Sequence, residues 1–184
     1  MRAFDFDHTI YNGYSYRDFC IYMALRRPWI WLYLPVIIFV ATLKLFHIVK
    51  MKHVVEWVLK PFYRLKHEHI VRFWDKHEKR LGQWYRDIHR DDDVVISATP
   101  AFFLEEACRR IGVTNLIATE IDMKTGKVID PYCYREGKWE RFVTVYGEDA
   151  RLEAYYTDTP KDSGMLDRAE EGYLVKKGKI TRIR

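Results

Sequence analysis

The chain has 184 residues, which fits one catalytic domain or a small core domain carrying an inserted subdomain. A composition of 48% hydrophobic and 16% aromatic residues excludes a disordered chain and allows a core without disulfides. The three cysteines are odd in number and far apart, so neither a disulfide framework nor a zinc site is predicted. A reduced, cytoplasmic setting is expected, and the first residues lack the apolar stretch of a signal peptide.

The net charge of +5 is unevenly distributed along the chain. Residues 12–90 contain 15 Lys and Arg against 6 Asp and Glu, whereas residues 91–184 contain 15 against 18. The basic half is expected to face an anionic partner, or else to form a solvated, lysine-rich surface. No recognisable nucleic-acid-binding motif accompanies the charge, so nucleic acid is not an expected partner.

The first ninety residues predict one short strand followed by helices. Residues 3–6 are apolar and end in acids, which predicts a buried strand with Asp5 and Asp7 at its end. Residues 12–27 are amphipathic and predict a helix. The uncharged run 29–43 is shorter than the roughly 20 residues that span a bilayer, and Pro35 is expected to kink it.

Helical periodicity continues from His53 to Ile88 through positions such as Leu65, and Pro61 is expected to separate two helices. After Asp93 the pattern changes to strands alternating with helices, which predicts a parallel sheet and an α/β fold. The expected elements are a strand at 94–96, a helix at 100–110, a hairpin of 116–121 with 127–129, a helix or strand at 141–145, a strand at 154–156, a helix at 165–171 and a strand at 173–175.

Asp5 and Asp7 are the main chemical feature of the sequence. Two acids at positions i and i+2 of a strand project to the same side, and the carboxyl end of a parallel strand faces the usual ligand crevice. Such close carboxylates repel each other unless a cation joins them or one takes a proton. Both solutions suit phosphoryl transfer, with Mg²⁺ offsetting charge and one acid protonating the leaving group. The alternative is a pair of acids that caps a turn.

Three further segments carry candidate residues. Asp158 and Asp162 follow an apolar strand and could complete the oxygen ligands of a magnesium ion, although Asp162 could instead cap a helix. Ser97 follows the strand 94–96 and could bind a phosphate oxygen, or cap the next helix. Lys138 is a candidate cation for the nucleophile and the phosphate, although most lysines are simply solvated.

Taken in order, these segments resemble the four motifs of the haloacid dehalogenase superfamily of phosphatases. DFDHT is similar to the first motif, VVISAT to the second, REGKW to the third and DTPKD to the fourth. The insert between the first two motifs resembles the C1-type cap of phosphoserine phosphatase-like members. The resemblance implies a Rossmann-like, three-layer parallel-sheet core of residues 1–11 and 91–184, with an all-helical C1 cap of residues 12–90.

The resemblance also implies a role for each residue. Asp5 would be the nucleophile that becomes aspartyl-phosphate, and Asp7 the general acid and then the general base. Ser97 and Lys138 would hold the phosphoryl oxygens, with Thr99 as an alternative to Ser97. Thr9 would orient Asp7 and contribute to the phosphate site.

The same resemblance implies a magnesium site. Asp158 would ligate Mg²⁺ together with Asp5 and the backbone carbonyl of Asp7. Asp162 would support the metal from outside its direct ligands, or bind Lys138. Most of the acceleration would then come from aligned charges around the phosphoryl group.

The apolar segment 28–49 bears on the substrate. Asp5 precedes the insert and Ser97 follows it, so the insert must cross any membrane an even number of times or not at all. A re-entrant or interfacial hairpin is the simplest arrangement, with its basic surroundings against anionic headgroups. This arrangement resembles the phosphatidylglycerophosphatase C-like branch of the superfamily. The alternative is a buried cap helix or a dimer interface.

Three hypotheses about function follow. The first is a phosphatase that acts on a lipid phosphate, such as phosphatidylglycerophosphate, at the inner face of the cell membrane. The second is a soluble phosphatase for a small phosphomonoester such as phosphoserine. The third is a non-catalytic phospholipid-binding module, against which the intact acids Asp5, Asp7 and Asp158 argue, since a binder needs no nucleophile beside a metal.

Overall fold

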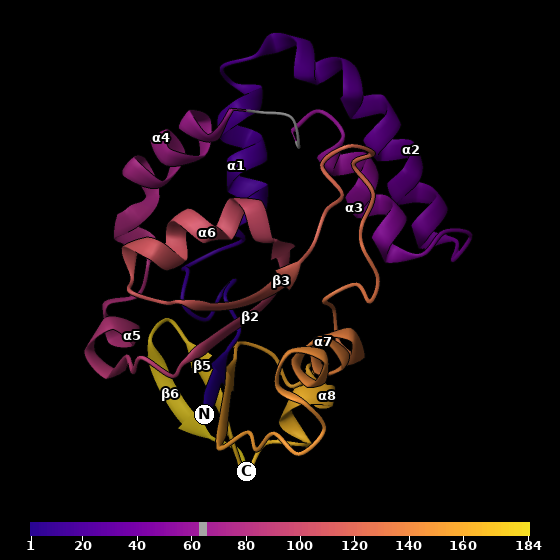
Figure 1. The fold of residues 1–184 in the computed structure, drawn as a ribbon. Helices are drawn as coiled ribbons and strands as arrows, with labels where there is room; N and C mark the ends of the chain where they lie inside the picture. Colours follow the sequence, from indigo (N-terminus) through magenta and orange to yellow (C-terminus); the bar gives the residue numbers. More distant parts are fainter. Residues whose placement is uncertain (63–65) are drawn as a thin grey trace.

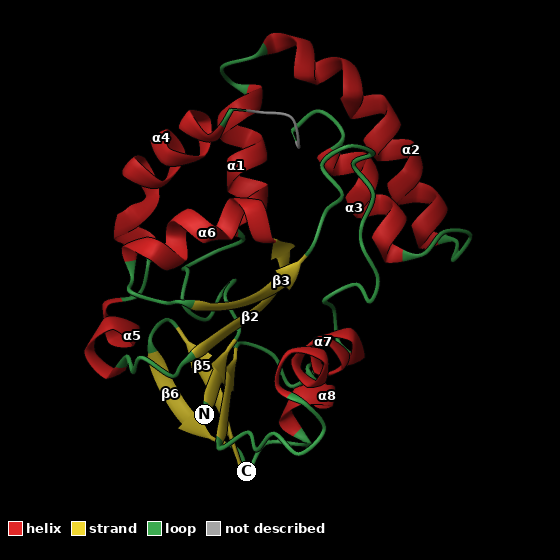
Figure 2. Cartoon of the chain, in the orientation of Figure 1, coloured by secondary structure: helices red, strands yellow, loops and turns green. Residues whose placement is uncertain are grey.

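The computed structural model describes residues 1–62 and 66–184, so Leu65 lies outside the described residues. Six strands form one sheet in the order β3-β2-β1-β4-β5-β6, and only β6, at the edge, runs antiparallel to its neighbour (Figure 2). The strands are β1 Arg2–Phe4, β2 Val94–Pro100, β3 Asn115–Thr119, β4 Ala154–Thr157, β5 Glu171–Lys176 and β6 Lys179–Arg182. The α/β fold with a mainly parallel sheet is therefore confirmed.

The central strand β1 has buried residues on both faces, as parallel strands covered by helices on both sides do. On one face, Phe4 packs with α6 (Ala101–Arg110). On the other, Ala3 packs with α7 (Glu136–Tyr146) and the short α8 (Ser163–Leu166). Figure 1 shows these helices on opposite sides of the sheet, which gives a three-layer core.

Residues between β1 and β2 are helical wherever they form regular structure in the described part of the chain. The elements are α1 Ser15–Ala24, η1 Pro28–Tyr33, α2 Leu34–Leu45, α3 Met51–Leu59, α4 His67–His77, η2 Glu78–Arg80 and α5 Gln83–Ile88. In Figure 1, α1 to α4 lie together beyond α6, and α2 packs along α3. Phe19, Phe73 and Trp74 share one buried cluster with Phe103 of α6, so the insert is packed onto the core.

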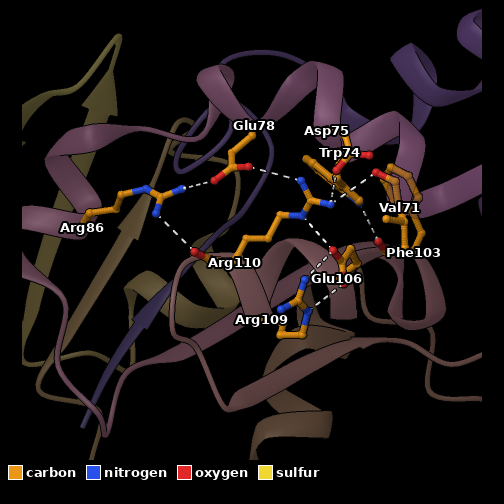
Figure 3. Close-up of polar contacts among 9 residues, drawn as sticks. All are labelled: Val71, Trp74, Asp75, Glu78, Arg86, Phe103, Glu106, Arg109 and Arg110. Carbon is orange, nitrogen blue, oxygen red and sulfur yellow. Dashed lines mark hydrogen bonds and ion pairs between the residues drawn. The ribbon is translucent and has the colours of Figure 1, made fainter. Parts of the chain in front are cut away.

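Arg110 of α6 ties the insert to the core (Figure 3). It donates hydrogen bonds to Glu106 in its own helix, to Glu78 of η2 and to Asp75 of α4, at 2.7, 3.2 and 2.8 Å. Arg109 also donates to Glu106, at 2.8 Å. The bonds from Arg109 and Arg110 lower the pKa of Glu106 from 4.5 to about 2. These charge-assisted bonds join segments far apart in sequence at the base of the insert.

Several boundaries differ from those expected. Ser97 lies within β2 rather than after it, because the strand continues to Pro100 through a register irregularity. Residues 115–119 join the main sheet as β3, and the expected hairpin reduces to one antiparallel bridge between Ile121 and Val128. Pro35 lies in the first turn of α2, where a proline is tolerated, and the apolar run changes from the 3-10 helix η1 to the α-helix α2 just before it.

The predicted boundaries of the C-terminal elements also differ from those in the structure. Residues 141–145, open between helix and strand, belong to α7. The helix expected at 165–171 is confined to Ser163–Leu166, since Glu171 already begins β5. The edge strand β6 was not predicted, and it pairs with β5 across the tight turn at Lys177 and Gly178. Its four exposed residues lack the alternation that marks a half-buried strand.

The segment Pro28–Leu45 has 18 residues and a mean hydropathy of 1.7, so it is long and apolar enough to cross a membrane by length and composition. Only 11% of it is buried. It is the one segment of this kind in the described part of the chain.

Candidate active site

The buried ammonium group of Lys138 is the centre of the site. Lys138 is 3% exposed in the first turn of α7. Its Nζ donates to Asp5 Oδ1 at 2.8 Å, to Asp162 Oδ2 at 2.6 Å and to the Tyr155 hydroxyl at 3.1 Å. Burial alone lowers the pKa of Lys138, but the charges of Asp5 and Asp162 raise it well above its ordinary value. The shift favours the charged form of the lysine, and three hydrogen bonds hold it in place.

Asp5 follows β1 directly and is 8% exposed. Its backbone N–H donates to the Tyr156 carbonyl at 2.8 Å, which fixes the end of β1 against β4. Burial raises its pKa to about 7, because desolvation and the charge of Asp162 outweigh the ion pair with Lys138. Lys138 occupies Oδ1, whereas Oδ2 makes no hydrogen bond with any described residue. The two oxygens of Asp5 therefore have different surroundings.

Asp7 is held separately from Asp5. The backbone N–H of Ser15, at the start of α1, donates to Asp7 Oδ1 at 2.7 Å, and Thr99 Oγ1 donates to Asp7 Oδ2 at 2.7 Å. Burial raises the pKa of Asp7 despite these bonds. His8 follows in the left-handed region with φ of 59°, and its N–H donates to the Gly13 carbonyl at 3.0 Å. This tight loop brings the start of α1 back to the end of β1.

Ser97 and Thr9 complete the residues singled out from the sequence. Ser97 is buried in β2, and its hydroxyl oxygen accepts a bond from the Thr99 N–H at 3.2 Å. Thr9 is also buried, and its hydroxyl has no hydrogen-bond partner among the described residues. Ser15 and Thr99 therefore make the hydrogen bonds that orient Asp7, and Thr9 makes none of them.

Asp158 lies one residue beyond β4. Because Phe4 of β1 pairs with Tyr156 of β4, Asp158 follows β4 at the same carboxyl-terminal end of the sheet as Asp5 and Asp7. Its carboxylate interacts with its own backbone N–H, and among the described residues it makes no ion pair and no hydrogen bond with another residue. Burial raises the pKa of Asp158, and the negative charge of Asp162 adds to the effect.

A metal ion would find few side-chain ligands here. No three His, Cys, Asp or Glu side chains group as a metal site in the described ranges. Asp162 Oδ2 accepts bonds from Lys138, Tyr155 and Thr157, so of the two roles expected for Asp162 the structure shows the contact with Lys138. The donor set still fits Mg²⁺, which accepts one or two carboxylates, a backbone carbonyl and several waters. In the part of the chain that the structure describes, Asp158 and the second oxygen of Asp5 are the carboxylate groups of this site that no other residue binds.

Sequence reasoning missed Ser15, Tyr155 and Thr157. A serine that opens a helix close after two acids is a signal that could have identified Ser15, since helix N-termini bind carboxylates. Tyr155 and Thr157 carry no such signal, because tyrosine and threonine are common in any strand. Only the packing of α7 against the sheet shows that they contact Lys138 and Asp162.

A cavity of about 920 Å³ adjoins the loop that follows Asp7. His8 and Thr9 line one wall, and the basic residues Lys79, Arg80 and Lys177 are among those that line the rest. Asp75 and Glu78 also line this cavity, whereas Asp5, Asp7 and Asp158 do not, so the cavity borders the loop after Asp7 without containing the carboxylates.

Residues 3–167 match the family model described as haloacid dehalogenase-like hydrolase. Over 92 residues the chain is 33% identical to Protein CicA of Caulobacter vibrioides, and this match covers 47% of the chain and 41% of that relative. The match thus spans less than half the length of CicA.

Two solved structures are similar in fold. One is a protein of unknown function from Bordetella pertussis Tohama I, with 18% identity, a TM-score of 0.73, and coverage of 94% of this chain and 87% of the other. The second is a phosphoserine phosphohydrolase-like protein from Francisella tularensis subsp. tularensis SCHU S4, with 14% identity, a TM-score of 0.61, and coverage of 94% and 86%. At these identities the likeness concerns the fold.

Proposed function

The chain belongs to the haloacid dehalogenase-like hydrolase family, and from this premise we propose that it is a phosphatase whose nucleophile is Asp5. One observation carries the proposal. Asp5 is bound to Lys138 through one carboxylate oxygen and presents the other to the site, while Asp7, two residues on, is held by Ser15 and Thr99. Two adjacent acids in different environments suit two different roles.

The chain's own residues divide the reaction into two displacements. In the first, Asp5 Oδ2 bonds to phosphorus, the bond to the leaving oxygen breaks, and Asp7 gives that oxygen its proton. In the second, Asp7 takes a proton from water, the water oxygen bonds to phosphorus, and Asp5 is released with inorganic phosphate. The raised pKa of Asp7 favours the protonated form that the first step needs.

Lys138 would attract the phosphoryl oxygens through its fixed positive charge, and Ser97 would offer them a hydroxyl at the carboxyl end of the same sheet. A magnesium ion held by Asp5, Asp158 and the backbone carbonyl of Asp7 would offset the negative charge of the phosphoryl group. The buried cation and carboxylates are already ordered, so they would not need to reorganise during the reaction.

For the substrate we propose a lipid phosphate at a membrane surface. Large apolar side chains on η1 and α2 are exposed, among them Leu32, Ile38 and Phe39. Several large apolar side chains exposed on one segment favour an interaction surface. Asp5 precedes the insert and Ser97 follows it, so a single crossing would separate them, and a helix lying in the membrane interface avoids this. Phosphatidylglycerophosphate is the candidate that the resemblance of the insert suggests.

A second candidate is a phosphatase for a small phosphomonoester. The likeness in fold to a phosphoserine phosphohydrolase-like protein supports it. The exposed apolar segment would then be covered by a second copy of the chain. Such a protein would hydrolyse phosphoserine without vesicles.

The first experiment measures phosphate release from an aryl phosphate in the presence of magnesium. Asp5→Asn should abolish release, while Asp149→Asn, a change at an exposed carboxylate, should leave it intact. Activity that survives in Asp5→Asn would refute the covalent mechanism. The second experiment compares vesicles of phosphatidylglycerophosphate or phosphatidic acid with phosphoserine and sugar phosphates. Preference for the soluble compounds would favour the second candidate.

A further inference from the structure

The insert contains an apolar cavity of about 480 Å³ between α1, α3 and the η1–α2 segment, which we call the cap groove. Most of its wall is apolar, and Cys20, Ala24, Ile37, Val55 and Val58 are representative. Its volume is within the range of pockets that hold small ligands. An apolar wall of this kind favours an apolar occupant.

The residues that line the cap groove include exposed apolar side chains and one residue adjacent in sequence to the candidate site. At its outer side, Trp31 and Leu34 line the groove and are also 54% and 41% exposed. At its inner side, Tyr16 follows Ser15, whose N–H binds the Asp7 carboxylate. An occupant could therefore extend from the membrane-facing segment toward the catalytic carboxylates.

The inner wall offers one unused polar group. The Tyr16 hydroxyl is buried and has no hydrogen-bond partner among the described residues. Its ring packs against Phe62 and Phe103, which holds the side chain in place. A buried hydroxyl without a partner favours an occupant that brings an acceptor oxygen.

The charges around the segment identify the kind of occupant. Arg26 and Arg27 precede η1, Lys44 lies in the last turn of α2, and Lys50 precedes α3. A second copy seated symmetrically on this face would place like charges close together, which is unfavourable. An anionic lipid offers the complementary charge, with an apolar chain for the groove and an ester oxygen for Tyr16.

We propose that the cap groove binds one acyl chain of a phospholipid substrate, with the Tyr16 hydroxyl donating to an ester oxygen of that lipid. The proposal deepens the proposed function and rests on it for the identity of the substrate. Binding of the acyl chain does not require catalysis. An experiment can therefore contradict the groove assignment without contradicting the proposed function, and the reverse also holds. The acyl chain would position the phosphate at Asp5.

Filling the groove tests the proposal. Ala24→Phe and Val58→Phe fill it from α1 and from α3, and Ala41→Phe adds the same group to an exposed position of α2 outside the groove. Both filling variants should lose at least about tenfold in kcat/KM on long-chain phosphatidic acid in mixed micelles, a loss that two or more unburied methylenes would cause. Their hydrolysis of an aryl phosphate, and both activities of Ala41→Phe, should stay within about twofold of the original chain.

Binding measured without turnover separates the two proposals. In Asp5→Asn, affinity should rise along the series butyl, octyl, dodecyl and hexadecyl phosphate by about fourfold for each methylene that the groove buries. Ala24→Phe and Val58→Phe combined with Asp5→Asn should flatten this rise. If affinity rises along the series but the original chain has no phosphatase activity, the proposed function is refuted and the groove assignment stands. A flat series in Asp5→Asn, or filling variants that keep full activity on long-chain lipid, would overturn the groove assignment.

The alkyl phosphate series measured on Asp5→Asn alone needs no groove variant. It therefore tests the groove assignment even if both filling variants fail to fold. Tyr16→Phe provides an additional check on the polar contact. It should weaken binding of an ester-linked lipid phosphate and leave binding of its ether-linked analogue unchanged. Equal effects on both lipids would contradict the hydrogen bond to Tyr16.

Discussion

The ammonium group of Lys138 lies 2.6 Å from the carboxylate of Asp162, closer than the 2.8 Å that separates it from Asp5. The same oxygen of Asp162 accepts a bond from Tyr155 at 2.9 Å. Asp162 and Asp5 therefore bind the same ammonium group, and Asp162 makes the shorter contact. We expect Asp162 to position the lysine beside Asp5.

Lys138→Met should lower kcat by about 10²–10³, because it removes a fixed positive charge from the phosphoryl site. Asp162→Asn should have a smaller effect, since the amide can still accept a bond from Lys138. Circular dichroism and thermal unfolding check that both variants fold. Equal losses in the two variants would contradict the assignment of direct contact to Lys138 and of positioning to Asp162.

Thr99 and Ser97 should differ in the kinetic constant that they control. Thr99→Val removes the 2.7 Å bond to Asp7, so kcat on an aryl phosphate should fall, by about 10-fold or more, with KM little changed. Ser97→Ala removes a hydroxyl from the proposed phosphate site and should raise the inhibition constant for inorganic phosphate. Steady-state kinetics with phosphate inhibition measures both. The reverse pattern would assign the phosphate contact to Thr99.

Asp158→Asn should raise the magnesium concentration that gives half-maximal activity by about 10–100-fold, because the metal loses a charged ligand. EDTA should abolish activity, and added magnesium should restore it. Asp149→Asn, at an exposed carboxylate, is the matched control and should need no more magnesium than the original chain. Activity that is indifferent to EDTA would refute the metal site.

Glu106→Gln should destabilise the fold in a pH-dependent way. The pKa of Glu106 is lowered in the folded state, so its contribution to stability is present above its ordinary pKa of 4.5 and is lost as the pH falls toward about 2. At neutral pH the loss should be on the order of 2–3 kcal/mol in the free energy of unfolding. Urea unfolding at pH 7 and pH 3 should show the difference between variant and original chain shrinking at the lower pH.

Glu105→Gln provides the control for that experiment, since the neighbouring Glu105 is exposed. It should change the free energy of unfolding by no more than about 0.5 kcal/mol at either pH. A gap between Glu106→Gln and the original chain that stays constant from pH 7 to pH 3 would show that the ion pairs with Arg109 and Arg110 do not carry the effect.

Phe39→Glu tests the membrane surface. Phe39 is 62% exposed on α2, so the change costs the fold little while it places a negative charge against anionic headgroups. Flotation with anionic liposomes at low salt should fall sharply, and aryl phosphate hydrolysis should persist. Ile180→Glu, at an exposed apolar residue of β6, should float like the original chain. Equal flotation of both variants would contradict binding through α2.

The sequence predicted those features that depend on residues close together in the chain. The α/β fold follows from strands alternating with helices after Asp93, and the structure confirms it. The spacing of Asp5 and Asp7 at the end of a strand needs only two neighbouring residues. Element ends were less accurate, because the continuation of β2 to Pro100 and the short α8 depend on what packs against them.

The tertiary structure decided which distant groups meet. Lys138 and Asp5 are 133 positions apart, and their contact depends on how α7 packs against the sheet. The bonds that Ser15 and Thr99 make to Asp7, and the cap groove, likewise join separate elements. Periodicity and turn chemistry record local preferences of the chain, whereas register and packing set side-chain distances across it. For this reason the sequence by itself determined the kind of chemistry, and only the folded chain determined which groups hold each catalytic residue.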